Sequence, residues 1–203
     1  MKKESGALRL YTGLTAPEGF LEQVFSIDKL VYSEELCGVI ENMHKRYWRC
    51  RDTYLLVYDG DRVVGYICFL PIGETLLTQL NDPDDRTMRD DDITPEEMEP
   101  WSLAHLNHLF ILSVAILPEY RDGQAVRLLS DGLLAFLRDK EAAGYAIGSI
   151  SGSAVSDGGA NFIRRLHGTF VKELDEGYRY FRADRNQVKE LLANGLLLKN
   201  LRK

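Results

Sequence analysis

The spacing of apolar side chains predicts two helices in the first quarter of the chain. Residues 17–32 carry apolar positions at helical spacing, and Pro17 stands near the first turn, where a proline is well tolerated. A second helix is expected from Ser33, as its N-cap, to about Tyr47. After Tyr47 the helical period is lost, and β-branched and aromatic residues begin to dominate.

Strand-like runs fill much of the remaining chain, and polar turns separate them. Asp59-Gly60-Asp61 and Asp175-Glu176-Gly177 each divide two such runs, which predicts two hairpins. Residues 108–117 are the most apolar run and are expected to form a central strand. The expected strands are residues 7–13, 53–58, 62–70, 108–117, 145–153, 169–174 and 178–182, with further helices at 124–140, 157–167 and 187–199.

Residues 72–107 interrupt this pattern with an acidic segment. Between Asp82 and Glu99 the chain has nine acidic residues and two arginines, a local net charge of −7. Thr94-Pro95, with a glutamate at residue 97, predicts the start of a helix. Two interpretations of the segment stay open: a solvated insertion, or an acidic rim that attracts a cationic substrate.

The composition excludes several classes of function. The 203 residues predict one domain, with a core at about 7–183 and a C-terminal helix within 184–203. The net charge of −6 and scattered basic residues disfavour a nucleic-acid partner. No apolar run reaches the roughly 18 residues of a membrane span, no apolar segment follows the two initial lysines, and the three cysteines form no CxxC pair. We therefore expect a cytoplasmic protein with reduced thiols, no metal site and no membrane contact.

One strand-to-helix connection is a candidate phosphate site. The segment Ile116-Leu117-Pro118-Glu119-Tyr120-Arg121 ends the central strand, and Gly123 lies in the turn before the next helix. A helix start exposes unpaired N–H groups and the positive end of its dipole, which suits a phosphate. The dipole contributes only roughly 0.3–1 kcal/mol when exposed, so direct N–H bonds must carry most of the binding. The alternative is an ordinary polar turn.

The order of these elements resembles that of the GNAT acyl-CoA N-acyltransferases over about residues 7–183. The segment 116–121 is similar to the family's V-x-P-x-x-R motif, and Ala160–Phe170, ANFIRRLHGTF, is similar to its A-x-x-x-Y-x-x-x-G-F segment. The resemblance implies an α/β (α+β) fold. Its mixed, mostly antiparallel sheet would have six to seven strands flanked by helices, an acidic insertion between the third and fourth strands, and a C-terminal helix.

The resemblance also implies acetyl-CoA as the cosubstrate, without a metal. In the family, the main chain of the central strand binds the pantetheine arm, and the turn binds the pyrophosphate. Here the family's R-x-x-G-x-G/A glycine positions hold Gln124 and Val126. The turn is therefore either shifted by one residue or less open, and weakened CoA affinity stays open. The residues expected to bind CoA are Val114, Ala115, Ile116, Arg121, Asp122, Gly123, Gln124, Ala125, Val126 and Asn161.

The implied reaction is direct transfer of the acetyl group to an amine in a ternary complex. Because only about one alkylamine molecule in 10³ is neutral at pH 7, a base is needed. His108, which opens the central strand, is the expected base; His105 and a purely structural role for His108 stay open. Arg164 stands where many members carry an acidic tyrosine, and an arginine cannot donate a proton. Tyr178 is then the expected acid, with Tyr180 as an alternative.

The acceptor, a small-molecule amine or a peptide amine, is expected between the first two helices and the acidic insertion. Tyr32 and Glu35 lie at the junction of those helices and are expected to contact it, although the glutamate equally suits a helix start. Three functions stay open: an N-acetyltransferase, a CoA-binding protein without catalysis, and a transferase of longer acyl chains. The leucines of the terminal helix either pack on the domain or form a homodimer contact.

Overall fold

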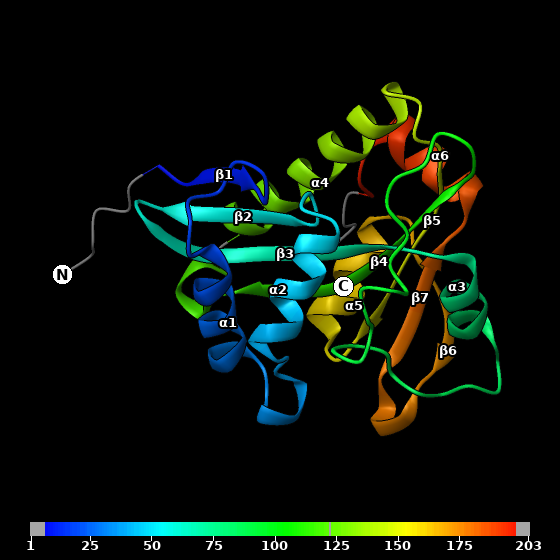
Figure 1. The fold of residues 1–203 in the computed structure, drawn as a ribbon, viewed down its shortest axis with the longest axis horizontal. Coiled ribbons are helices and arrows are strands. Elements are labelled where there is room, and N and C mark those ends of the chain that lie inside the picture. Colours follow the sequence, from blue (N-terminus) through cyan, green and yellow to red (C-terminus); the bar gives the residue numbers. More distant parts are fainter. Residues whose placement is uncertain (1–6, 122, 198–203) are drawn as a thin grey trace, which may run out of the picture.

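A mixed β-sheet forms the centre of the protein in the computed structural model, which describes residues 7–121 and 123–197 (Figure 1). Within these residues the sheet has seven strands in the order β1-β2-β3-β4-β5-β7-β6. Only β4 and β5 pair in parallel; every other pair is antiparallel. The strands are β1 (Arg9–Thr12), β2 (Tyr54–Asp59), β3 (Arg62–Ile72), β4 (Asn107–Ile116), β5 (Ile147–Ala154), β6 (Thr169–Glu173) and β7 (Arg179–Ala183).

Helices cover both faces of the sheet (Figure 1). The first two α-helices lie on one face through Phe20, Val24 and Met43, and the long fourth helix lies on the other through Leu129 and Leu133. The α-helices are α1 (Phe20–Val31), α2 (Ile40–Arg49), α3 (Glu74–Asn81), α4 (Gln124–Ala142), α5 (Asp157–Arg165) and α6 (Arg185–Asn194), and the 3-10 helices are η1 (Glu34–Leu36), η2 (Pro118–Tyr120) and η3 (Asp175–Gly177). No helix in the described ranges has both the length and the apolar composition needed to cross a bilayer.

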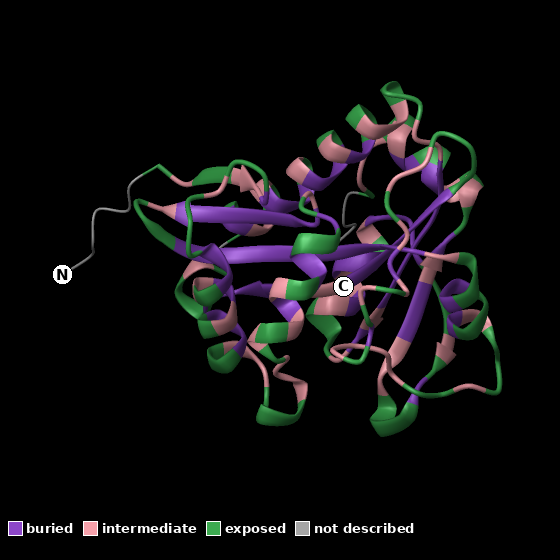
Figure 2. Ribbon diagram, in the orientation of Figure 1, coloured by how far each residue is buried: buried purple, intermediate pink, exposed green. Residues whose placement is uncertain are grey.

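Burial on both faces explains why the central strands are nearly continuous in apolar residues. From Val63 to Ile72, β3 is buried at every position, and most of β2 and β4 is buried as well. Figure 2 shows these strands as the buried centre of the molecule, with exposed residues on the outer turns of the helices. Sandwiching the sheet between helices removes both faces from water, which is the main stabilising contribution to such a fold.

The two parallel strands separate toward their C-terminal ends. β4 pairs with β5 only over Asn107–Ile111, although β4 continues to Ile116. β5 continues to Ala154, and its other edge pairs with β7 over Ile150–Ala154. The edge of β4 that faces β5 is therefore unpaired over its last five residues. The expected mixed sheet, its insertion between the third and fourth strands and its C-terminal helix are confirmed.

Several expected boundaries are wrong, each for a local reason. Ser33 caps the short η1 rather than α2, which begins seven residues later. Ser156 rather than Asp157 caps α5, because its Oγ accepts a hydrogen bond from the Gly159 N–H at 3.1 Å. The terminal helix begins at Arg185 with a capping box and ends at Asn194; residues 198–199 of its expected span lie outside the described residues.

The acidic insertion is more ordered than the sequence predicts. Its first part forms α3, a helix that is absent from the expected elements and that buries Leu76, Leu77 and Leu80. The expected helix start at Thr94 is wrong: residues 94–97 form a turn in which the Glu97 carboxylate accepts the Thr94 N–H at 2.8 Å. The chain then pairs with β3 by a bridge from Met98 to Ile72, so helical continuation is replaced by strand pairing.

Candidate active site

A cavity of about 730 Å³ lies where β4 and β5 separate. One side is the free end of β4, and the opposite side is the end of β5 with the first turns of α5. The junction of α1 and α2, together with the acidic insertion, closes the far end. Its lining includes Asp28, Tyr32, Leu36, Met43, Tyr66, Cys68, Met88, Asp90, Leu112, Ser113, Val114, Ile116, Arg121, Val126, Ser156 and Phe162.

The turn before α4 leaves its backbone open. Gly123 is the N-cap of α4 with φ of 108°, a conformation that side chains other than glycine rarely adopt. A Cβ built on Gly123 would meet no atom within 4 Å, so a ligand can approach the main chain closely. Arg121 is anchored by a 2.9 Å hydrogen bond from its Nε to the carbonyl of Ile116. The turn thus combines an open backbone, a helix start and a positive charge.

The expected CoA residues fall into two groups. Val114, Ile116, Arg121 and Val126 line the cavity. Ala115, Gly123, Gln124, Ala125 and Asn161 do not, and the side chain of Asn161 instead accepts a 3.4 Å hydrogen bond from Arg164. Asp122 lies outside the described residues.

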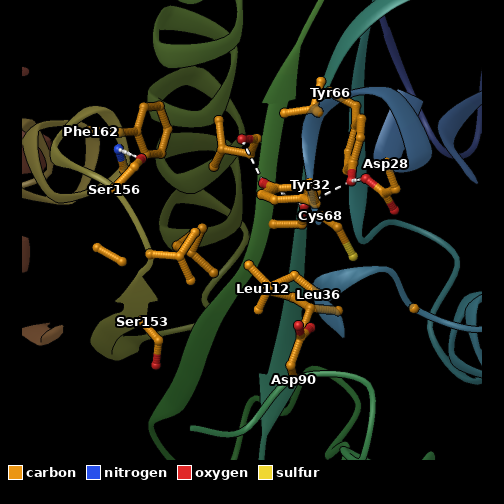
Figure 3. A pocket seen from close by; sticks show the side chains of 18 of the residues that line it. Asp28, Tyr32, Leu36, Tyr66, Cys68, Asp90, Leu112, Ser153, Ser156 and Phe162 are labelled. Atoms are coloured by element: carbon orange, nitrogen blue, oxygen red, sulfur yellow. Dashed lines mark hydrogen bonds between the residues drawn. The ribbon is translucent and has the colours of Figure 1, made fainter. Parts of the chain in front are cut away.

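A row of hydrogen-bonding groups crosses the cavity floor from α1 to β4. Tyr66 on β3 contacts the carboxyl of Asp28 on one side and the hydroxyl of Ser113 on the other, the latter at 2.7 Å. Ser113 Oγ lies 3.1 Å from the Tyr32 hydroxyl, which donates to the carbonyl of Val114 at 2.9 Å. Figure 3 shows Asp28, Tyr66 and Tyr32 converging on this region. The row joins a buried acid to the free end of β4.

Burial shifts the proton affinities of this row. Desolvation raises the pKa of Asp28 to about 7, against the lowering effect of the Tyr66 hydrogen bond and with help from the negative charges of Asp90 and Asp91. Desolvation likewise raises the pKa of Tyr32 to about 12. Asp28 is therefore present in both protonation states near neutral pH, as a proton-transferring group must be.

The insertion contributes a second carboxylate. Desolvation raises the pKa of Asp90 to about 6. In Figure 3 its carboxylate points toward Leu36 and Leu112, and it has no hydrogen-bond partner among the described residues. The neighbouring Asp91 is paired instead, with its Oδ1 2.7 Å from the guanidinium of Arg46.

The two residues expected to transfer protons lie outside the cavity. His108 is at the opposite end of β4, where its Nδ1 is 2.9 Å from Ser149 Oγ and its Nε2 is 3.0 Å from Glu74 Oε1. Tyr178 lies beside η3, where a hydrogen bond to Glu176 raises its pKa and the charge of Glu35 adds to the effect. Neither residue lines the cavity.

The two residues expected to contact the acceptor are separated by the structure. Tyr32 lines the cavity and belongs to the hydrogen-bonded row. Glu35 is exposed on η1 and does not line it, whereas the adjacent Leu36 does.

Sequence reasoning missed Asp28, Tyr66 and Asp90. One signal was present for Asp28: it falls on the buried stripe of α1 with Val24 and Ile27, where a carboxylate is unexpected. Tyr66 gave no such signal, because aromatic residues on a buried strand are ordinary core. Asp90 could not be singled out from the acidic residues around it.

Comparison with solved structures shows the same fold in proteins of low sequence identity. The loading GNATL domain of CurA from Lyngbya majuscula aligns with a TM-score of 0.63 at 16% identity, over 89% of this chain and 99% of that one. The GNAT-like decarboxylase GphF in complex with isobutyryl-CoA gives 0.59 at 10%, over 89% and 100%. NAA60 of Arabidopsis thaliana in complex with a bisubstrate analogue gives 0.55 at 10%, over 88% and 98%.

The family is shown by the sequence itself. None of the curated proteins is significantly similar to this chain. The model of the acetyltransferase (GNAT) family, however, matches residues 21–168, which include nearly all of α1, the separated strands, the turn and α5. The match confirms the family predicted from the order of elements and the 116–121 motif. The chain belongs to the acetyltransferase (GNAT) family.

Proposed function

We propose that this protein is an N-acetyltransferase that moves the acetyl group of acetyl-CoA to an amine by direct attack in a ternary complex. One observation carries the proposal: a single cavity extends from the open turn, along the free end of β4, to two carboxyl groups of raised pKa. The cavity thus offers a place for a phosphorylated acyl carrier at one end and for a cation at the other.

The residues at the first end fit CoA. Val114 and Ile116 lie on the stretch of β4 that β5 leaves unpaired, and although their carbonyls accept from Tyr32 and Arg121, this edge suits the amides of a pantetheine arm. The amides at the start of α4 suit a pyrophosphate. Arg121 adds a positive charge beside that turn. Bound acetyl-CoA would supply the activated thioester, so the protein has only to position it against the acceptor.

The residues at the second end fit an amine. Asp90 faces the cavity without a partner in the described chain, and an ammonium group would supply the missing positive charge. Asp28 would accept a proton from that ammonium. Its pKa of about 7 is well matched to this task, because a large fraction is ionised at neutral pH yet still basic.

Apolar residues that line the same cavity support a second candidate function, the transfer of longer acyl chains. Leu36, Met43, Met88 and Leu112 line the cavity near the acceptor end. Flexible methionine side chains adapt to ligands of different shape, and the similar fold of GphF was solved with isobutyryl-CoA. Acetyl-CoA and isobutyryl-CoA should therefore be compared as donors.

The test is CoA release from acetyl-CoA in the presence of single amines and peptides with free N-termini, with the acetylated product identified by mass spectrometry. We expect amine-dependent release, and a KM for the amine raised about tenfold or more by Asp90→Asn. Asp84→Asn, an exposed position of the same insertion outside the cavity, controls for the change in net charge. Binding of acetyl-CoA without acetylation of any amine would reject the transferase in favour of a CoA-binding protein.

A further inference from the structure

The protons available to the hydrogen-bonded row on the cavity floor can be counted. It has four contacts: Asp28 to Tyr66, Tyr66 to Ser113, Ser113 to Tyr32, and Tyr32 to the Val114 carbonyl. Three hydroxyl groups contribute three protons, since the carbonyl has none and an ionised carboxylate only accepts.

With Asp28 ionised, the row is therefore one proton short. Tyr66 then donates to Asp28 and Tyr32 donates to Val114, so the hydroxyl of Ser113 can donate to only one of its two neighbours. One contact holds two oxygens without a hydrogen between them. Protonation of Asp28 supplies the fourth proton, and every donor then points from α1 toward β4.

We propose, on the basis of the acetyl transfer proposed above, that this row is a proton relay in which Tyr32 protonates the departing CoA sulfur and Asp28 replaces the proton. Tyr32 is placed for the task because its hydroxyl contacts Val114, whose main chain faces the proposed pantetheine site. The residue at the usual acid position is Arg164, and Tyr178 lies outside the cavity.

The relay balances the protons of the reaction. The Asp28 carboxylate takes one proton from the acceptor ammonium, and the freed nitrogen lone pair forms the C–N bond. The C–S bond breaks with its electron pair on sulfur, which receives the Tyr32 proton. Tyr32 regains a proton from Ser113, Ser113 from Tyr66, and Tyr66 from Asp28. Asp28 thereby returns to the carboxylate. The second nitrogen proton leaves to water, and the net products are the amide, CoA thiol and one proton.

A relay also removes the main objection to a buried tyrosine as the acid. Tyr32 alone would have to become a phenolate in a site that disfavours the charge, as its pKa of about 12 indicates. When Ser113 returns a proton in the same event, no phenolate forms. The other charged groups facing Asp28 are Asp90 and Asp91 of the insertion and Arg46 of α2. Arg46 is paired with Asp91, and in the described chain none of the three is hydrogen-bonded to the row, so Asp28 is its proton source.

The experiment measures single-turnover thiol release from bound acetyl-CoA in the presence of an amine that the wild type acetylates. We expect Tyr32→Phe and Ser113→Ala each to slow release by roughly 10²-fold or more, the range of general acid–base catalysis. Acetyl-CoA binding should change less than about threefold. Because the two residues act as one unit, the double variant should be no slower than the slower single variant.

Tyr47→Phe is the matched control. Its hydroxyl is buried and donates to the Gly13 carbonyl at 2.9 Å, as Tyr32 does to Val114, but it does not line the cavity. The wild type should also show a curved dependence of rate on the D2O fraction, which Ser113→Ala makes linear. A Tyr32→Phe rate within threefold of wild type, or multiplicative losses in the double variant, would overturn the relay alone. A wild type that acetylates no amine overturns the proposed function and the relay with it.

Discussion

Asp28 is a carboxyl group that the fold buries without a bonded cation. Its side chain is only 7% exposed, yet it contacts a tyrosine hydroxyl rather than a cation. Arg46, whose positive charge acts to lower the pKa of Asp28, is paired with Asp91. The negative charge of an ionised Asp28 is therefore not fully balanced by a cation, and ionisation costs free energy. A structural role does not require such a group, whereas proton transfer requires a carboxyl group whose pKa is raised.

This cost predicts how stability depends on pH. The folded-state pKa of about 7 is above the unfolded value, so the folded protein binds the proton more tightly than the unfolded chain. The stabilising contribution of protonated Asp28 to the free energy of unfolding is fully present below about pH 4 and is lost as the pH rises through 7. Since one pKa unit corresponds to about 1.4 kcal/mol, ionisation costs on the order of 4 kcal/mol.

Asp28→Asn should remove that pH dependence. The neutral amide can donate to the Tyr66 oxygen as the protonated acid does, so the variant should be more stable than wild type at pH 8 and nearly equal to it at pH 4. Urea unfolding at the two pH values measures this difference. Asp131→Asn, on an exposed part of α4, controls for net charge. Equal effects of Asp28→Asn at both pH values would contradict the assignment.

Residue roles were the part of the site that sequence predicted least well. The segment around Arg121 could be identified because its chemistry lies in consecutive residues. The row from Asp28 to Ser113 joins positions on α1, β3 and β4 that are up to 85 residues apart, and their contact follows from the β3–β4 register and the packing of α1 on the sheet. His108 was predicted as the base from its place at a strand end, but the strand carries it to the end away from the cavity.

At the scale of elements, the acidic insertion completes the cavity. It is held at one place by Arg46, which bonds the carbonyls of Asp91 and Ile93 at 3.1 and 3.2 Å besides the Asp91 carboxylate. At another place Lys172 of β6 donates to the carbonyls of Asp82 and Asp85. The insertion is thus a fixed wall, and its position decides where Asp90 lies.

Arg46 should consequently control both stability and acceptor binding. Arg46→Met removes the cation that pairs with Asp91 and leaves its carboxylate only the Val39 N–H and the Asn42 amide as donors. We expect a loss of about 2–4 kcal/mol, below the range for fully buried pairs because Asp91 is 22% exposed. The KM for the amine should rise, whereas acetyl-CoA binding should not change. Chemical unfolding and steady-state kinetics provide the measurements.

Arg62→Met is the matched comparison, because its pair with Glu119 is exposed on both sides and should contribute less than about 1 kcal/mol. The stability and the amine KM of Arg46→Lys should lie between those of Arg46→Met and the wild type. An ammonium keeps the charge but cannot reproduce three bonds from one planar group. An Arg46→Met variant that keeps wild-type stability and amine KM would show that the insertion is held in other ways.

The order of elements was predictable because it rests on period and turn chemistry. Strand and helix periods differ clearly, and the two hairpin turns carry the glycines that such turns require. The insertion was less predictable because its helix is short and its remaining contacts are isolated ones, to Arg46 of α2, to β3 and to β6. Such contacts leave no periodic trace in a sequence.

At the scale of the whole molecule, the separation of β4 from β5 links the fold to the proposed chemistry. It opens the sheet at one place, and the turn, the free strand edge and the two carboxyl groups all border that opening. The central claim is that this opening binds acetyl-CoA through the turn at Gly123. The irregular glycine spacing makes that claim worth direct measurement.

The measurement is calorimetric titration of acetyl-CoA into the wild type and Gly123→Val. We expect micromolar binding to the wild type, about −8 kcal/mol, and a loss of tenfold or more in the variant, because valine strains the backbone at φ of 108° and blocks the approach of phosphate. Gly60→Val, which also has positive φ and open surroundings but lies in the β2–β3 hairpin, should bind normally. Acetyl-CoA binding that Gly123→Val leaves intact, or no binding by the wild type, would contradict the account.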